Sequence, residues 1–148
     1  METDSVSKSI VINTNISNAW NQLSDITELD WVEGQKSTKS LTKMHRGVGT
    51  GRLISFDDGS NVEEYVVGWS PKKYFSYIAI SGLPLDAYHA TISITKINDK
   101  IRITWESYFS SKSTKSEFND FTRFLSQFYI TSLQNLRTSL EREKLLKK

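Results

Sequence analysis

The amino-acid sequence predicts an α+β fold, in which a curved antiparallel sheet of about seven strands lies against one long C-terminal helix. Two observations predict it: short alternating segments fill much of the first two thirds, and the last third carries apolar residues at helical spacing. The helical stripe consists of Phe118, Phe121, Phe124, Leu125, Phe128, Leu136 and Leu140. Because burial stabilises such side chains by about 1.5–3 kcal/mol each, we expect all four phenylalanines to lie against the sheet. A lined space between helix and sheet follows from that arrangement.

The expected order of elements is one strand, two short helices, six strands and the long helix. Ser5 to Asn13 alternates polar and apolar residues and predicts the first strand. Ser17 is expected to cap a short helix, and Asp25 with Glu28 resembles the capping box of a second one. The polar stretch from Gly34 to Met44 predicts an exposed edge strand.

Turn sequences divide the remaining strands. Asp57-Asp58-Gly59-Ser60 separates strands expected at 52–56 and 61–69, and a further strand is expected at 74–80. Asn98-Asp99 joins strands expected at 87–97 and 100–109, which is the clearest hairpin signal in the chain. Antiparallel hairpins with helices toward the two ends indicate α+β rather than a doubly wound parallel sheet.

Composition limits the classes of function. With 148 residues, the chain is expected to form a single domain over residues 1–148. A net charge of +2, spread along most of the chain, argues against nucleic-acid binding, and the basic end from Arg142 to Lys148 suits the C-terminal dipole of a helix. The absence of cysteine excludes disulfides and cysteine-based zinc sites. No segment is apolar enough for a signal peptide or a membrane span, so we expect a cytoplasmic protein without integral membrane association.

No cofactor or metal is expected. The glycine-rich stretch from Gly47 to Gly51 leads into a strand, so it offers no helix N-terminus to a dinucleotide phosphate. The two histidines, His45 and His89, are far apart in the sequence and have no cysteine beside them. The sequence does not indicate an oligomeric state.

Alternation along the strands assigns side chains to two faces of the sheet. With Asn98-Asp99 at the turn tip, the inward pairs are Ile94 with Ile103, Ile92 with Trp105, and Tyr88 with Phe109. A bulge in the last strand would exchange the faces of Trp105 and Glu106. The same procedure at the Asp58-Gly59 turn places on the inner face Arg52, Ile54, Glu63, Tyr65, Val67 and Trp69, and Tyr77 joins them from the next strand.

Arg52 and Glu63 are the two charged residues in this inner set, and two interpretations stay open. They form either a structural ion pair at the wet end of the sheet or the polar end of an apolar pocket. In the second interpretation the hydroxyls of Tyr65, Tyr77 and Tyr88 complete the polar end.

Several segments, in their order along nearly the whole chain, resemble the START-like (SRPBCC) helix-grip superfamily. They are residues 16–25, 49–52, 63–67, 83–88 and 105–109, followed by the terminal helix. This superfamily contains START lipid-transfer domains, the birch-pollen allergen group, polyketide cyclases and plant abscisic-acid receptors. The nearest resemblance is to the polyketide cyclase/dehydrase-like subgroup. It implies a helix-grip fold and a ligand cavity between the sheet and the C-terminal helix.

The resemblance to the hormone receptors also suggests pocket positions. Glu63, Tyr77, Tyr88, Phe124, Phe128 and Ser132 fall where those receptors place pocket residues, and Lys36 falls near their carboxylate-binding lysine. Ala90 and Phe128 depart from the receptor pattern, and the gate-like Ser81-Gly82-Leu83-Pro84 falls in a later hairpin. The full set of expected ligand-binding residues is Lys36, Arg52, Glu63, Tyr65, Tyr77, Tyr88, Trp105, Phe109, Phe121, Phe124, Phe128 and Ser132.

Three functions are compatible with these residues. The first hypothesis is storage, transport or sensing of a hydrophobic or aromatic small molecule. The second is a cyclase or dehydratase-like enzyme for a hydrophobic carbonyl substrate, with Glu63 as general base. The third is a co-chaperone or assembly factor that binds through the outer face of the sheet.

Overall fold

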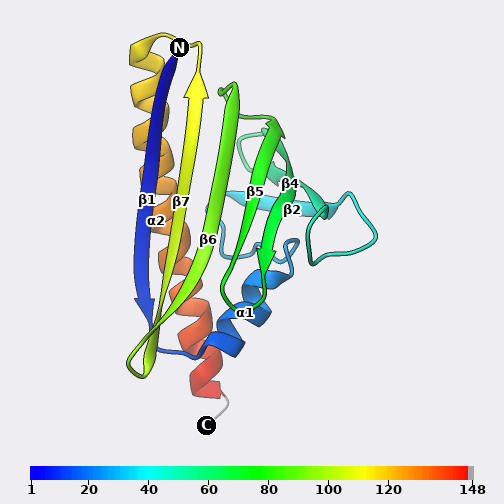
Figure 1. Cartoon of the computed structure of the whole chain (residues 1–148), viewed down its shortest axis with the longest axis vertical. Helices are drawn as coiled ribbons and strands as arrows, with labels where there is room; N and C mark the ends of the chain where they lie inside the picture. The colour runs from blue at the N-terminus through cyan, green and yellow to red at the C-terminus, as the bar shows by residue number, and fades with distance from the viewer. Residues whose placement is uncertain (147–148) are drawn as a thin grey trace.

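A computed structural model describes residues 1–146 as a seven-stranded antiparallel sheet with a long helix along one face (Figure 1). The elements are β1 (Glu2–Ile12), α1 (Ile16–Ser24), β2 (Gln35–Ser40), β3 (Gly51–Phe56), β4 (Asn61–Ser70), β5 (Tyr74–Ser81), β6 (Ala87–Ile97), β7 (Lys100–Ser111) and α2 (Lys115–Leu146). The strand order is β1-β7-β6-β5-β4-β3-β2. This architecture confirms the expected α+β helix-grip fold. Lys147 and Lys148 of the expected basic helix end lie outside the described residues.

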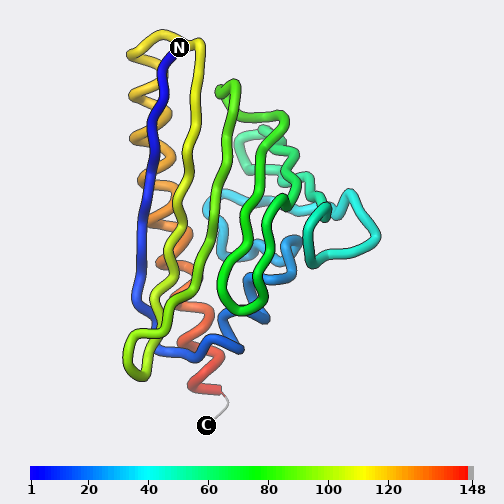
Figure 2. Tube along the Cα trace, in the orientation of Figure 1, coloured from blue at the N-terminus to red at the C-terminus, as the bar shows by residue number. Residues whose placement is uncertain are grey.

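The two helices occupy the same side of the sheet. Figures 1 and 2 show α2 running along β1 and β7, with α1 near the C-terminal part of α2. Residue contacts join α2 to β1 and α1 to β6. Within residues 1–146, no helix has the length and apolar character that crossing a membrane requires.

The expected second short helix does not form. Residues 25–34 make turns instead, and the Asp25 carboxylate accepts hydrogen bonds from the Thr27 backbone N–H at 3.0 Å and the Thr27 hydroxyl at 2.7 Å. This local turn engages the side chain that the capping-box interpretation assigned to a helix start. The N-cap of α1 is Asn15, not Ser17, and its side chain accepts a hydrogen bond from the Asn18 backbone N–H at 2.8 Å.

The β6–β7 hairpin has the expected register. Ile94 pairs with Ile103, Ile92 with Trp105 and Tyr88 with Phe109. Asn98 adopts a φ of 53° in the two-residue turn, a left-handed conformation that asparagine tolerates well. Trp105 is buried, so the alternative in which a bulge turns Glu106 inward does not occur.

The β3–β4 hairpin differs from the expected register by one residue. The Phe56 backbone N–H donates to the Ser60 carbonyl at 2.9 Å, which closes a loop of residues 57–59 with Gly59 at a φ of 89°. A three-residue loop of this kind shifts the pairing relative to a two-residue turn. Arg52 therefore lies opposite Glu64, not diagonal to Glu63.

This shift reverses the faces along most of β4. Val62, Glu64 and Val66 are buried on the inner side, so the expectation that Glu63, Tyr65 and Val67 face inward is wrong. Further along β4, the register shifts again between Val66 and Gly68. Trp69 then reaches the interior as expected and contacts Trp20, with 5.2 Å between ring centroids.

The buried stripe of α2 also differs from the expected one. Its buried residues are Phe118, Leu125, Tyr129, Ser132, Leu133, Leu136 and Leu140. Phe124 is 61% exposed, and Phe121 and Phe128 are only partly buried. The expectation that all four phenylalanines lie against the sheet is therefore wrong for Phe124, which lies on a neighbouring stripe of the helix.

Candidate functional site

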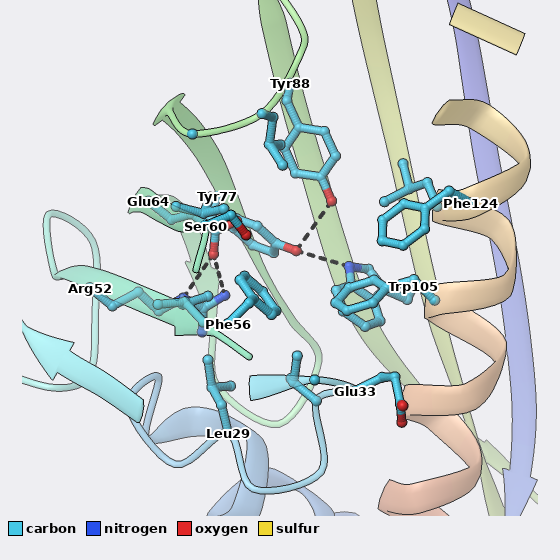
Figure 3. Close-up of a pocket in the computed structure, with 18 of the residues that line it drawn as sticks. Leu29, Glu33, Arg52, Phe56, Ser60, Glu64, Tyr77, Tyr88, Trp105 and Phe124 are labelled. Carbon is cyan, nitrogen blue, oxygen red and sulfur yellow. Dashed lines mark hydrogen bonds and ion pairs between the residues drawn. The ribbon is translucent and has the colours of Figure 1, made fainter. Parts of the chain in front are cut away.

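A cavity of about 420 Å³ lies between the inner face of the sheet and the N-terminal half of α2. Its wall is formed by residues of α1, the 29–34 segment, β3 to β7, the hairpin loops at 57–60 and 82–84, and α2. Most of this wall is apolar or aromatic. The volume falls within the roughly 300–1,000 Å³ that small-molecule sites occupy. Figure 3 shows the polar groups at two places inside and the aromatic rings toward α2.

The first polar place is a buried ion pair between Arg52 on β3 and Glu64 on β4. The Arg52 Nε and Nη2 atoms each lie 2.9 Å from Glu64 Oε1, and Nη1 donates to the Ile26 carbonyl at 2.8 Å. The guanidinium carbon also lies 5.0 Å from the centroid of the Tyr77 ring, a cation–π contact. These contacts satisfy a charge that would be expensive to bury alone.

Burial of Glu64 and its pairing with Arg52 shift the pKa of the Glu64 carboxyl in opposite directions. Removal from water raises the pKa of the Glu64 carboxyl above its ordinary value, and the charge and hydrogen bond of Arg52 oppose that rise. The pair thus forms a polar patch in the wall whose two charges offset each other.

The second polar place is a cluster of phenol groups. The Trp105 indole N–H donates to the Tyr77 hydroxyl at 3.0 Å, and the Tyr77 and Tyr88 hydroxyls are 3.5 Å apart (Figure 3). The Tyr88 hydroxyl also bonds to that of Tyr129. Three strands and α2 contribute to this cluster, so it links the sheet to the helix.

Burial keeps these phenols neutral. Loss of hydration raises the pKa of Tyr77 and Tyr88 well above the ordinary value, and burial also raises that of Tyr129. A neutral phenol both donates and accepts a hydrogen bond. The cluster is therefore suited to a carbonyl or hydroxyl group of a ligand, not to proton abstraction at neutral pH.

The mouth of the cavity combines aromatic rings with carboxylates. Phe128 contacts Phe56 and stacks with Phe124, in each case with 6.0 Å between ring centroids. The acidic lining residues at this end are Glu33, Asp57 and Asp58, all exposed. Arg52 is the one cation among the described residues that line the cavity.

Seven of the expected ligand-binding residues line the cavity: Arg52, Tyr77, Tyr88, Trp105, Phe121, Phe124 and Phe128. Five others do not: Lys36, Glu63, Tyr65, Phe109 and Ser132. The structure therefore brings the aromatic members together and separates several of the polar ones from the cavity.

Each of these five residues has another location. Glu63 accepts a hydrogen bond from the Tyr65 hydroxyl at 2.8 Å on the outer side of β4, and Lys36 is exposed on β2. Phe109 is buried against Phe118, with ring centroids 5.6 Å apart. Ser132 accepts a hydrogen bond from the Glu33 backbone N–H at 3.0 Å, which ties the 29–34 segment to α2.

The corresponding residues that sequence reasoning missed are Glu64, Tyr129, Phe56 and the 29–34 segment. The glycine at the third loop position of 57–59 was a signal for the correct register, because left-handed glycine is typical of three-residue hairpin loops. No periodic pattern marked residues 29–34, which line the cavity through turns. Within residues 1–146, no group of three or more potential ligands could hold a metal ion.

Solved structures share this fold at low sequence identity. An uncharacterised protein of Bacillus thuringiensis has a TM-score of 0.78 at 20% identity, with 93% of this chain and 98% of that chain covered. The protein XoxI of Bacillus cereus has a TM-score of 0.80 at 19% identity, with coverage of 95% and 97%. A protein of Nitrosospira multiformis has a TM-score of 0.78 at 18% identity, with coverage of 93% and 96%.

A search of the curated proteins found no match. Residues 3–141 match a family described as "Polyketide cyclase / dehydrase and lipid transport". The match spans the sheet, the cavity wall and most of α2. The chain therefore belongs to the polyketide cyclase/dehydrase and lipid transport family.

Proposed function

We propose that the protein binds a hydrophobic or aromatic small molecule in the cavity beneath α2, for storage, transport or sensing. The observation that carries this proposal is the 420 Å³ hollow with its mainly apolar wall and two places of polar groups. An apolar wall supplies binding free energy, at about 25 cal/mol for each Å² of apolar surface removed from water. A few convergent hydrogen-bonding groups then orient the ligand.

The ligand lies with its polar end toward the phenol cluster and its apolar part along Phe121, Phe124 and Phe128. Tyr77 and Tyr88 offer hydroxyls on the sheet side, and the phenylalanines offer ring faces and edges on the helix side. Family membership supports a hydrophobic ligand, because lipid transport is part of the family description. The cyclase or dehydratase-like and co-chaperone alternatives stay predictions, and Glu63 is not positioned to act as a base in this cavity.

Binding is tested with Prodan, an uncharged naphthalene ketone whose fluorescence shifts to the blue in an apolar site. We expect a saturable blue shift with one site per chain. Val62→Trp should weaken it, because Val62 is buried on the cavity wall and the indole would take up part of the hollow. Val67→Trp is the matched control, since Val67 is on the same strand and exposed on the other side.

Two results would contradict the proposal. One is the absence of saturable Prodan binding to the wild-type protein. The other is equal Prodan affinity in the wild type and in a folded Val62→Trp variant, since the dye would then bind elsewhere.

A further inference from the structure

The positive charge of Arg52 inside the cavity is already paired with a carboxylate of the protein, that of Glu64. Two nitrogens of Arg52 lie 2.9 Å from Glu64 Oε1, and a third donates to the Ile26 carbonyl. Both side chains are more than nine-tenths buried, so water screens their attraction weakly. A carboxylate from a ligand would therefore have to compete with Glu64 for Arg52 and would lie beside a second negative charge.

The mouth adds further negative charge. Glu33, Asp57 and Asp58 line this end, and none of them forms a salt bridge within the described part of the chain. Hydrogen bonds from the Ser60 hydroxyl and backbone N–H lower the pKa of Asp58, so its carboxylate is ionised at neutral pH. An anionic group at the mouth would meet like charges, which are repulsive.

An uncharged polar group of a ligand meets no such repulsion, because neutral phenols line the inner wall. The hydroxyls of Tyr77 and Tyr88 line the cavity and carry protons at neutral pH. Their oxygens can accept from a ligand hydroxyl, and the one hydroxyl proton that the bonds among Tyr77, Tyr88 and Tyr129 do not use can be donated to a ligand oxygen, without any charge having to be neutralised. The inner wall is thus complementary to an alcohol, ketone or ester.

We infer that the cavity selects ligands with an uncharged hydroxyl or carbonyl end and rejects carboxylates, and that Glu64 sets this selectivity by occupying Arg52. The inference rests on the proposed function and narrows its ligand class. Glu64 acts as a specificity-determining residue: it removes from the ligand the one cation of the described cavity wall. Free fatty acids are therefore not the ligand class of this protein.

The first experiment compares decanol with decanoate, which share an alkyl chain and differ in the charge of the polar end. Each is titrated into the wild-type protein at neutral pH by displacement of Prodan. We expect decanol to bind at least about tenfold more tightly than decanoate, the factor that 1.4 kcal/mol of unfavourable electrostatics produces. Decanoate binding as tightly as decanol would overturn the inference and leave the proposed function intact.

The second experiment changes the selectivity between decanol and decanoate by mutating Glu64. Glu64→Gln should raise decanoate affinity at least about tenfold, because it exposes the Arg52 charge to the ligand. Glu63→Gln is the matched control, since this neighbouring glutamate bonds to Tyr65 on the outer face and should leave both affinities unchanged. No gain of decanoate binding in a folded Glu64→Gln variant would contradict the role of Glu64.

A double variant separates the effect of Arg52 from the simple loss of a negative charge. Arg52→Gln with Glu64→Gln removes both charges, and replacing both partners of a buried pair is generally better tolerated than removing one. We expect this variant to bind decanoate less tightly than Glu64→Gln does. Equal decanoate affinity in the two variants would show that Arg52 does not receive the carboxylate. If Glu64→Gln fails to fold, the wild-type comparison still decides the selectivity.

If neither decanol nor decanoate displaces Prodan from the wild type while Prodan itself binds, the cavity is closed to alkyl amphiphiles and the inference fails. If Prodan does not bind, it is the proposed function that fails. The outcomes of the two proposals are thus distinguishable.

Discussion

The two halves of α2 lie on the same sheet, yet the C-terminal half contributes fully buried leucines to the core and the N-terminal half lines the main cavity. In the C-terminal half, Leu133, Leu136 and Leu140 are at most 1% exposed and pack in the core with Ile12 and Ile103. The N-terminal half instead places Phe121, Phe124 and Phe128 along the cavity. We call the C-terminal half of α2, residues 131–146, the anchor half, and the N-terminal half, residues 115–130, the roof half.

The difference lies in what surrounds each half. The C-terminal half packs in the core with Ile12 of β1 and Ile103 of β7, and β1 is paired along its full length with β7. Beneath the roof half, turns of the 29–34 segment and the 57–60 loop form part of the wall, and side chains on the curved inner face leave space. We infer that stability and binding depend on different parts of the same helix, so mutations should separate them.

Leu136→Ala should cause a large loss of stability without a change in binding. Removing a fully buried leucine side chain leaves a hole in a close-packed core, at a cost of about 2–5 kcal/mol in the free energy of unfolding. Urea denaturation measures this loss, and Prodan affinity in the folded variant should not change. Leu145→Ala is the control, because Leu145 is 68% exposed on the same helix and should cost little. A Leu136→Ala variant as stable as the control would contradict the division of α2 into anchor and roof.

Leu136 and Leu140 of α2 and the β6–β7 hairpin were predictable from sequence for the same reason, whereas the buried Leu133 was not in the expected stripe. Local signals determine both: Leu136 and Leu140 recur at helical spacing, and Asn98-Asp99 defines a two-residue turn. Every inward pair expected across β6 and β7 is present in the structure. Where the local sequence signals agree with the tertiary packing, the periodicity of apolar residues is sufficient to predict which side chains are buried.

The cavity wall was less predictable because small local choices have large consequences there. The loop at 57–59 has three residues instead of the expected two, and this places Glu64 rather than Glu63 on the inner face. A glutamate was therefore expected there, but at the wrong position. Phe124 belongs to an apolar pattern but lies at the edge of a hollow that only the packed structure defines. Sequence periodicity identifies apolar side chains without indicating whether they contact a core or an empty space.

Tyr88→Phe should have an intermediate effect that depends on pH. The variant loses the bonds of the Tyr88 hydroxyl to Tyr77 and Tyr129, at about 1–3 kcal/mol for buried partners left unsatisfied. Burial raises the pKa of Tyr88 well above 10, so its contribution is complete below the unfolded pKa of about 10 and is lost as pH rises through the folded pKa.

The stability difference between wild type and Tyr88→Phe should therefore narrow in alkaline solution. Urea denaturation over a series of buffers above and below pH 10, with the pH of ordinary tyrosine ionisation as reference, measures it. Tyr108→Phe, at an exposed position on the outer face of β7, is the matched control and should change stability little at neutral pH. A difference that widens with rising pH would contradict the buried, protonated state of the cluster.

Phe124→Ala should have the smallest effect on stability and a clear effect on binding. Because the Phe124 side chain is 61% exposed, its loss should change the free energy of unfolding by no more than about 0.5 kcal/mol. Ligand burial against its ring is lost, so Prodan affinity should fall about threefold to tenfold. Phe118→Ala, at a buried position of the same helix, should do the reverse and destabilise the fold by several kcal/mol, about 3–5 for a core phenylalanine. Equal losses of stability at the two positions would mean that Phe124 packs as part of the core. The two halves of α2 would then not differ in how their side chains pack.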